Sequence, residues 1–420
     1  MNAEILCVGT ELLLGDIVNT NATFIARGLA AMGINLFYQS VAGDNPERLK
    51  RALNIAKDRA DLIILTGGLG PTYDDLTKET VAELVGKTLV MDQPTMESIE
   101  AYFKKVNRPM TESNKKQAMI PEGATVFENH WGTAPGFGVE ADGKIFILLP
   151  GPPREMEPMF QASVVPYLAR FNDHVFVSQN IHIFGMGESA VEETLRDLMI
   201  GLTNPTLAPY AKDGEVNLRV TASAPTEQEA RAMIGPVIEQ VKERIGDVVY
   251  TTEEDSLQAA LVKALAAQGL TLATAESCTG GLLSSRIVEV SGCSSVFHCG
   301  VCAYSNDMKE QLLGVRHKTL KQFGAVSEQT ALEMARGVRK LGGADIGLST
   351  TGIAGPEGGT DKKPVGLVYV GISSPWMEKT IQLNLSRGQW DERNLIRYLA
   401  ASNALNLALQ AVKAKPGTIT

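Results

Sequence analysis

The sequence predicts an α/β protein in which two α/β units flank a smaller α+β module. Apolar strands alternate with amphipathic helices over residues 1–170, and the alternation returns from Leu257 onward. Such alternation is typical of doubly wound parallel sheets. Residues 171–250 supply two strand–helix pairs, and the polar stretch TTEEDS follows them. We therefore predict three domains, over residues 1–170, 171–250 and 251–414.

The elements follow in order from the spacing of apolar residues. In the first unit the predicted strands are AEILCVG (3–9), INLFYQSVAG (34–43), DLIILTGG (61–68) and KIFILLPG (144–151). Its predicted helices are NATFIARGLAAMG (21–33), ERLKRALNIAKDR (47–59) and KETVAELVG (78–86). The middle module alternates strand 174–185, helix 188–199, strand 215–225 and helix 227–246.

The last unit is read in the same way. Its predicted helices are 258–270, 279–290, 327–343 and 392–412, and its predicted strands are 271–277, 295–305, 344–355 and 365–372. We find no repeat that links it to the first unit.

Bulk composition narrows the classes of function. The 420 residues are 44% hydrophobic and 21% charged, an ordinary globular balance. The net charge is −9 with no long basic run, so neither nucleic acid nor a membrane surface is the expected partner. The N-terminus lacks the pattern of a signal peptide, so we expect a cytoplasmic protein. The five cysteines are expected to be buried, reduced side chains, including the CxxC at Cys299 and Cys302.

Turns rich in glycine, proline and acidic residues follow four strands of the first unit. Ligands of parallel sheets bind at the carboxyl ends of the strands, so these turns should form one site. The turn TGGLGPTYDD (66–75) can bring backbone N–H groups close to a phosphate. Asp75 could hold a divalent metal beside that phosphate, joined by Asp44 and Glu11. Asp74 is explained equally well as the cap of a helix.

Five segments of this unit resemble the CinA family, whose N-terminal domain is of the molybdopterin-binding type. They are GTELLLGDIVNTN (9–21), TGGLGPTYDDLTKET (66–80), ESNKKQAMIPEGA (112–124), NHWGTAPGF (129–137) and LPGPPREM (149–156). The resemblance implies a metal-dependent ADP-ribose pyrophosphatase that uses Mg²⁺ or Co²⁺, with K⁺ as a further candidate ion. The implied ligand-binding residues are Asn19, Asn21, Gly67, Gly68, Gly70, Pro150 and Arg154; the implied metal ligands are Glu11, Asp44 and Asp75, with Asp75 also catalytic.

Nucleophile candidates gather in the last unit. TAESCTGG (274–281) lies at a strand-to-helix junction, where a helix N-terminus favours an anion. Cys278 would gain thiolate character there, but no histidine is placed to act as its base. Ser294, followed by Tyr304 and Lys309, offers a serine with a tyrosine or lysine base. Taken by itself, Ser294 is better explained as a turn residue, together with Ser295.

The same unit resembles the CinA C-terminal domain over its whole length. The matching segments are TAESCTGG, SGCSS (291–295), AYSN (303–306), GAVS (324–327), TGIAGPEGG (351–359) and KPVG (363–366). The resemblance implies a three-layer α/β amidohydrolase that converts nicotinamide mononucleotide (NMN) to nicotinic acid mononucleotide and ammonia, without a cofactor. It puts the nucleophile at Ser294, with Tyr304 and Lys309 as catalytic partners. The implied substrate-binding residues are Ser277, Thr279, Gly280, Thr351, Gly352, Gly355 and Arg393, for which Arg387 is a rival.

The resemblance spans nearly the whole chain, and the middle module fits the KH-like region of the family. The predicted function is therefore a bifunctional enzyme of pyridine-nucleotide recycling that acts on NMN and ADP-ribose. A homodimer is the expected assembly. The alternative is a nucleotide- or molybdopterin-binding regulatory or competence protein with an inactive N-terminal domain.

Overall fold

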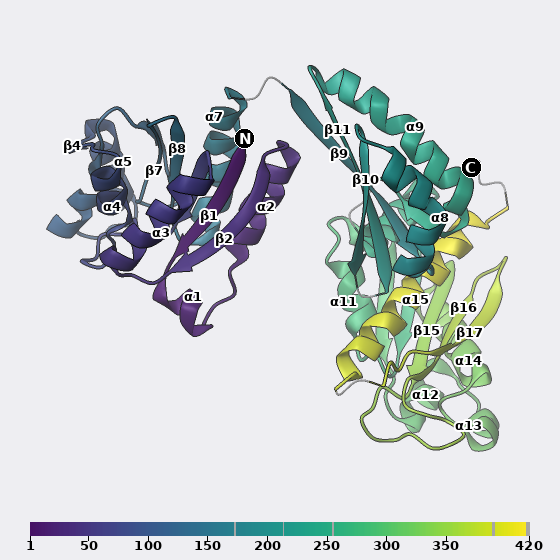
Figure 1. The fold of residues 1–420 in the computed structure, drawn as a ribbon. Helices are drawn as coiled ribbons and strands as arrows, with labels where there is room; N and C mark the ends of the chain where they lie inside the picture. Colours follow the sequence, from purple (N-terminus) through teal and green to yellow (C-terminus); the bar gives the residue numbers. More distant parts are fainter. Residues whose placement is uncertain (172–173, 213, 254–255, 389–390, 417–420) are drawn as a thin grey trace. The chain divides into compact units, whose positions relative to one another are not determined.

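The structure is a computed structural model of the chain (Figure 1). It describes residues 1–171, 174–212, 214–253, 256–388 and 391–416. The chain contains two compact units, Met1–Ser178 with Ala222–Met233, and Gln179–Thr221 with Ile234–Thr420. Three main sheets belong to the N-terminal α/β region, the middle module and the C-terminal α/β region.

The N-terminal sheet has six strands in the order β2-β1-β3-β8-β7-β6. The four predicted strands pair in parallel as β2 (Asn35–Ala42), β1 (Asn2–Val8), β3 (Leu62–Thr66) and β8 (Lys144–Leu149). We missed β7 (Gly136–Ala141) and β6 (Thr125–Phe127), which pair antiparallel and make the sheet mixed. The missed signal was Asp142–Gly143, both with positive φ, between β7 and β8; Asp-Gly is typical of a tight hairpin turn.

Helices cover both faces of this sheet (Figure 1). One apolar cluster joins β1 to α2 (Thr20–Ala31) and α6 (Pro153–Met159), and a second joins it to α3 (Pro46–Arg59) and α4 (Thr77–Leu84). Alternate residues of β1 enter the two clusters, as expected for a strand between two layers of helices. Further elements are α1 (Thr10–Leu14), α5 (Gln93–Lys105), η1 (Glu112–Ala118), η2 (Phe160–Val164), α7 (Val165–Ala169) and the pair β4 (Leu89–Met91) and β5 (Met119–Pro121).

The middle module is a four-stranded sheet with two helices. Its strand order is β10-β11-β9-β12, where β9 is Val175–Phe184, β10 Thr206–Lys212, β11 Glu215–Ala224 and β12 Val249–Thr251. The helices are α8 (Glu188–Gly201) and α9 (Glu227–Ile245), and the short η3 (Gly246–Val248) precedes β12. The sequence pattern did not predict β10, although the other long elements are those expected.

The C-terminal sheet has five strands in the order β14-β13-β15-β16-β17. The strands β14 (Phe297–Cys302), β13 (Leu272–Glu276) and β15 (Ile346–Gly352) are parallel, whereas β16 (Leu367–Ser373) and β17 (Glu378–Asn384) add antiparallel. One apolar cluster joins the sheet to α10 (Leu257–Ala267), α11 (Leu282–Val288) and α15 (Arg393–Lys413). The other joins it to α12 (Asn306–Leu313), α13 (His317–Phe323) and α14 (Glu328–Gly342). The result is the three-layer arrangement that the family resemblance implied, although β17, α12 and α13 were not predicted from the sequence.

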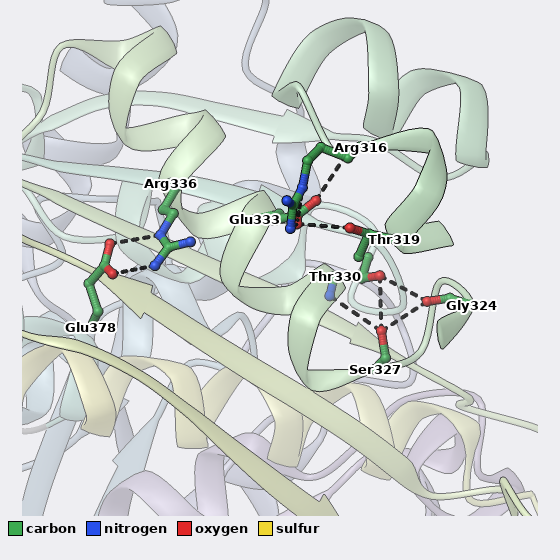
Figure 2. Close-up of polar contacts among 8 residues, drawn as sticks. All are labelled: Arg316, Thr319, Gly324, Ser327, Thr330, Glu333, Arg336 and Glu378. Atoms are coloured by element: carbon green, nitrogen blue, oxygen red, sulfur yellow. Dashed lines mark hydrogen bonds and ion pairs between the residues drawn. The ribbon is translucent and has the colours of Figure 1, made fainter. Parts of the chain in front are cut away.

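Polar contacts hold α14 in place against its neighbours (Figure 2). The Glu333 carboxylate, on this helix, accepts hydrogen bonds from Arg316 and Thr319 at the start of α13. Ser327 caps α14, because its Oγ accepts from the Thr330 N–H at 3.3 Å. Arg336 donates twice to Glu378 of β17, at 2.9 and 2.5 Å, so α14 is also tied to the edge of the sheet.

Candidate functional sites

The N-terminal sheet carries a cavity of about 590 Å³ at the carboxyl ends of β1, β3 and β8. Nine of the predicted residues line it: Glu11, Asn19, Asn21, Asp44, Gly67, Gly68, Gly70, Asp75 and Pro150. They come from separate turns that follow different strands, and the structure brings them into one cavity, as their positions in the sequence predicted. Arg154 does not line the cavity, because its side chain is exposed on the first turn of α6.

The glycine turn after β3 requires glycine for two reasons. Gly67 has φ of 104°, and a Cβ there would lie 2.1 Å from the Val8 carbonyl oxygen. A Cβ on Gly70 would lie 2.5 Å from Oδ2 of Asp75. Absence of side chains therefore lets the turn pack against β1 and lets the Asp75 carboxylate approach the backbone.

The carboxylates that line the cavity are fixed separately. Asp44 Oδ2 accepts the Thr10 N–H at 2.8 Å, and Asp75 Oδ2 accepts the Thr72 N–H at 2.9 Å. Among the described residues, no three His, Cys, Asp or Glu side chains lie close enough to hold a metal. The predicted set of Glu11, Asp44 and Asp75 is therefore not a ready-made cage. It fits a metal that takes most of its oxygens from a bound phosphate and from water, as Mg²⁺ commonly does.

The two predicted asparagines have different roles in the geometry. Asn19 caps α2, because its Oδ1 accepts the Ala22 N–H at 3.1 Å. Asn21 donates to Thr66 Oγ1 at 2.9 Å and to the Gly151 carbonyl at 2.7 Å. Its Oδ1 is buried and has no hydrogen-bond partner, although the residue lines the cavity. A buried unpaired acceptor is costly, so this oxygen suits a donor on a ligand.

Two lysines beside the cavity were missed from sequence. Lys116 donates to the Thr72 carbonyl at 3.1 Å and also to the Asp75 carbonyl. Lys78 is 2% exposed and donates to the Lys116 carbonyl. Burial lowers the pKa of Lys78 to about 8. The side chain of the neighbouring Lys115 is 45% exposed, and it pairs with Glu112 at 2.9 Å.

In the C-terminal region the structure joins Lys309 to Ser277. Ser277 follows β13, and Lys309 lies on α12, which follows β14. Lys309 Nζ lies 3.1 Å from Ser277 Oγ, 2.8 Å from the Ala303 carbonyl and 2.9 Å from the Tyr304 carbonyl. Lys309 is 1% exposed, and burial lowers its pKa to about 8. A serine beside a desolvated lysine is a nucleophile–base pair.

This geometry contradicts the predicted pairing of Lys309 with Ser294. Ser294 lies on the exposed turn η4 (Cys293–Ser295), which precedes β14. Lys309 binds the carbonyls that follow β14. Because β14 has six residues, its ends lie roughly 20 Å apart. Ser294 therefore lies at the amino end of β14, whereas the Lys309 ammonium lies at its carboxyl end.

Two further expectations for this site need correction. The Tyr304 side chain is 66% exposed, and only its backbone carbonyl contacts Lys309. Cys278 does not gain thiolate character, because burial raises its pKa to about 12. Its lack of a histidine base and its raised pKa agree in making it a poor nucleophile.

The buried Glu276 organises the turn that carries Ser277. One carboxylate oxygen accepts the N–H groups of Gly281 and Leu283 at 2.9 and 3.0 Å. The other accepts the Ser284 N–H at 2.8 Å and its hydroxyl at 2.5 Å. The carboxylate thus takes up donors at the N-terminus of α11 that a ligand could otherwise use. Glu276 was not among the predicted residues, although an acidic residue directly before the glycine turn was a signal for it.

The remaining predicted residues surround the same turn. Thr279 Oγ1 lies 2.7 Å from Thr350 Oγ1, next to Thr351, whose hydroxyl donates to the Ala325 carbonyl at 2.8 Å. Gly280 has φ of 58°, and Gly352 is held where a Cβ would lie 2.7 Å from the Leu367 carbonyl oxygen. These contacts connect the two glycine-rich loops through the ends of β13 and β15.

Two arginines of α15 extend this arrangement. Arg393 donates to the carbonyl of Gly355, as expected of a residue near the second loop. Arg397, which we did not predict, donates to the Thr279 carbonyl at 3.3 and 2.9 Å. Arg387, the rival of Arg393, contacts Glu392 through its backbone N–H. One helix therefore supplies a guanidinium to each glycine-rich loop.

The fold and these sites define an α/β protein with one candidate ligand-binding site in each α/β region. Family models match residues 4–170 as "Probable molybdopterin binding domain", 178–251 as "Damage-inducible protein CinA KH domain" and 254–412 as "CinA C-terminal domain". The CinA-like protein of Kosmotoga olearia is 51% identical over 414 residues, 98% of this chain and 99% of that protein. The CinA-like protein of Dictyoglomus turgidum is 50% identical over 407 residues, 97% and 98% of the two chains. The chain belongs to the CinA family.

Among solved structures, the competence/damage inducible protein CihA from Agrobacterium tumefaciens is 38% identical, with a TM-score of 0.36. The match covers 37% of this chain and 93% of that protein. Within the part of the chain that the structure describes, no helix is long and apolar enough to cross a membrane.

Proposed function

We propose that the C-terminal domain hydrolyses the carboxamide of NMN, with Ser277 as the nucleophile and Lys309 as its base. The observation that carries the proposal is the 3.1 Å contact between Lys309 Nζ and Ser277 Oγ in a buried setting. The family resemblance supplies the substrate. The contact with Lys309 supports Ser277 in place of Ser294, because it gives Ser277 a neighbouring base.

The contacts of Lys309 suit the neutral amine as a base. A neutral lysine has two N–H bonds and one lone pair. The N–H bonds can serve the carbonyls of Ala303 and Tyr304, which leaves the lone pair for the Ser277 hydroxyl. In the protonated state all three ammonium hydrogens are used instead. The site therefore tolerates both states that proton transfer requires.

The reaction then follows with its atoms balanced. Lys309 takes the Ser277 proton while Oγ bonds to the carboxamide carbon, and it passes that proton to the nitrogen as the C–N bond breaks. Ammonia leaves, and an ester to Ser277 remains. Water attacks this ester, Lys309 accepts the water proton, and Ser277 Oγ leaves and is reprotonated. The product is a carboxylic acid that loses its proton to solvent as the released ammonia gains one, so the net products are a carboxylate and an ammonium ion. No step of this scheme requires a metal.

Two serine variants test this assignment. Ser277→Ala should lower ammonia release from NMN by at least about 10⁴-fold, since serine hydrolases lose that much or more without their nucleophile. Ser294→Ala should remain close to wild type, because its exposed turn is far from Lys309. Retained deamidation in Ser277→Ala, or its loss in Ser294→Ala alone, would refute the proposal.

For the N-terminal domain we infer a second activity, the metal-dependent hydrolysis of ADP-ribose to AMP and ribose 5-phosphate. The cavity lined by the glycine turn, Asp44 and Asp75 supports it. Bound Mg²⁺ or Co²⁺ would offset phosphate charge and activate water. The turn's backbone N–H groups would orient the phosphates, and Asn21 Oδ1 would accept a ligand hydroxyl. A non-catalytic nucleotide- or pterin-binding domain is the rival.

The test uses both activities of the full chain. Asp75→Asn, or a metal chelator, should abolish AMP release from ADP-ribose. Ammonia release from NMN should continue, because Ser277 and Lys309 need no metal. If AMP release persists after both treatments, neither Asp75 nor a metal takes part in the reaction. If the wild type releases no AMP at any metal concentration, the non-catalytic binding domain is favoured.

A further inference from the structure

The turn that carries Asp75 is held from two directions. Internally, the Thr72 N–H donates to Asp75 Oδ2 at 2.9 Å, and the Asp75 N–H points back to the Thr72 carbonyl at 3.4 Å. Externally, the Lys116 ammonium donates to the Thr72 and Asp75 carbonyls. The Lys116 ammonium therefore connects the two ends of the turn, at Thr72 and Asp75.

Lys116 is itself fixed by its surroundings. Its ammonium lies 3.6 Å from Glu79 Oε1, and both side chains are less than a third exposed. The Lys116 carbonyl accepts a hydrogen bond from Lys78, whose side chain is buried. This lysine therefore links η1 to the start of α4 as well as to the turn. A flexible surface lysine would lack these restraints.

We propose that Lys116 is a positioning residue of the N-terminal cavity, which keeps the Asp75 carboxylate turned toward a bound pyrophosphate group. Lys116 acts through the turn and does not line the cavity. This positioning role rests on the proposed pyrophosphatase activity, because it explains how the Asp75 carboxylate is oriented in that site. A misplaced carboxylate matters because shifts of about 1 Å cost on the order of 10²-fold in rate.

The adjacent lysine supplies a matched control. Lys115 has the same charge and lies on the same short helix, but pairs with the exposed Glu112. In the full-length chain, Lys116→Met should lower kcat/KM for AMP release by 10- to 100-fold and speed amide hydrogen exchange at Thr72 and Asp75. Lys115→Met should match the wild type in both, and Lys116→Arg, which keeps a donor, should recover part of the loss.

Two readouts separate this proposal from the proposed function. Mn²⁺ binding in the presence of inorganic pyrophosphate should weaken at least tenfold in Lys116→Met, whether or not ADP-ribose is hydrolysed. Ammonia release from NMN reports that the C-terminal domain is folded, and unchanged amide hydrogen exchange in β3, away from the turn, reports that the N-terminal domain is folded. Unchanged exchange at Thr72 and Asp75 would overturn the positioning role, as would faster exchange with unaltered Mn²⁺ binding. If the wild type releases no AMP, but hydrogen exchange and Mn²⁺ binding change in Lys116→Met as expected, the proposed pyrophosphatase activity is refuted and the positioning role of Lys116 stands.

Discussion

Deamidation of NMN should depend on pH through Lys309. Its pKa is lowered by burial from 10.5 to about 8. At pH 7 a group with pKa 8 is neutral in about 10% of molecules, against about 0.03% for an ordinary lysine. Burial therefore raises the population of the base by roughly 300-fold, equivalent to about 3 kcal/mol. We expect kcat/KM to rise close to tenfold per pH unit below pH 8 and to level off above it.

The assay is ammonia release from NMN between pH 6 and 9.5 at constant ionic strength. Lys309→Arg should be inactive throughout, since a guanidinium stays protonated. A second readout is stability. At the Lys309 position the unfolded chain binds more protons than the folded one between pH 8 and 10.5, so this lysine should make the free energy of unfolding rise with pH across that window. The rise should be smaller in Lys309→Met, in which Lys78, whose pKa is also about 8, still contributes. A flat rate profile, or near-normal activity in Lys309→Met, would refute the reasoning.

Two further substitutions test the turns that follow β3 and β13. In Gly67→Ala, a left-handed φ of 104° is combined with a Cβ that would lie 2.1 Å from the Val8 carbonyl oxygen. We expect this variant to lose more than about 2 kcal/mol of N-terminal domain stability in urea unfolding, while ammonia release continues. An unchanged unfolding curve would show that the close approach does not require glycine. Glu276→Gln turns an amide NH₂ toward buried donors, so it should cost roughly 1–3 kcal/mol and reduce deamidation; a variant with normal stability and rate would show that Glu276 does not hold the turn.

Sequence patterns predicted the four parallel strands and the cavity of the N-terminal domain, because the residues that line the cavity lie in the turns after those strands. Asp44, Gly67 and Asp75 converge for that reason alone. The same rule, applied to the last domain, would have rejected Ser294, which precedes its strand, and favoured Ser277, which follows one. The distinction between Lys115 and Lys116 depends on the direction of side chains on a short 3₁₀ helix, which spacing does not determine.

Lys78 and Lys309 show why a lowered pKa alone does not identify a base. Both are buried, and desolvation lowers the pKa of each to about 8. Lys78 donates to a backbone carbonyl, which has no proton to give. Lys309 has two carbonyls and, in addition, the Ser277 hydroxyl. A neutral Lys309 can therefore accept a proton from its third partner, whereas the contact of Lys78 supports only a structural role. Deamidation should accordingly depend on Lys309, and Lys78→Met should leave its pH profile unchanged.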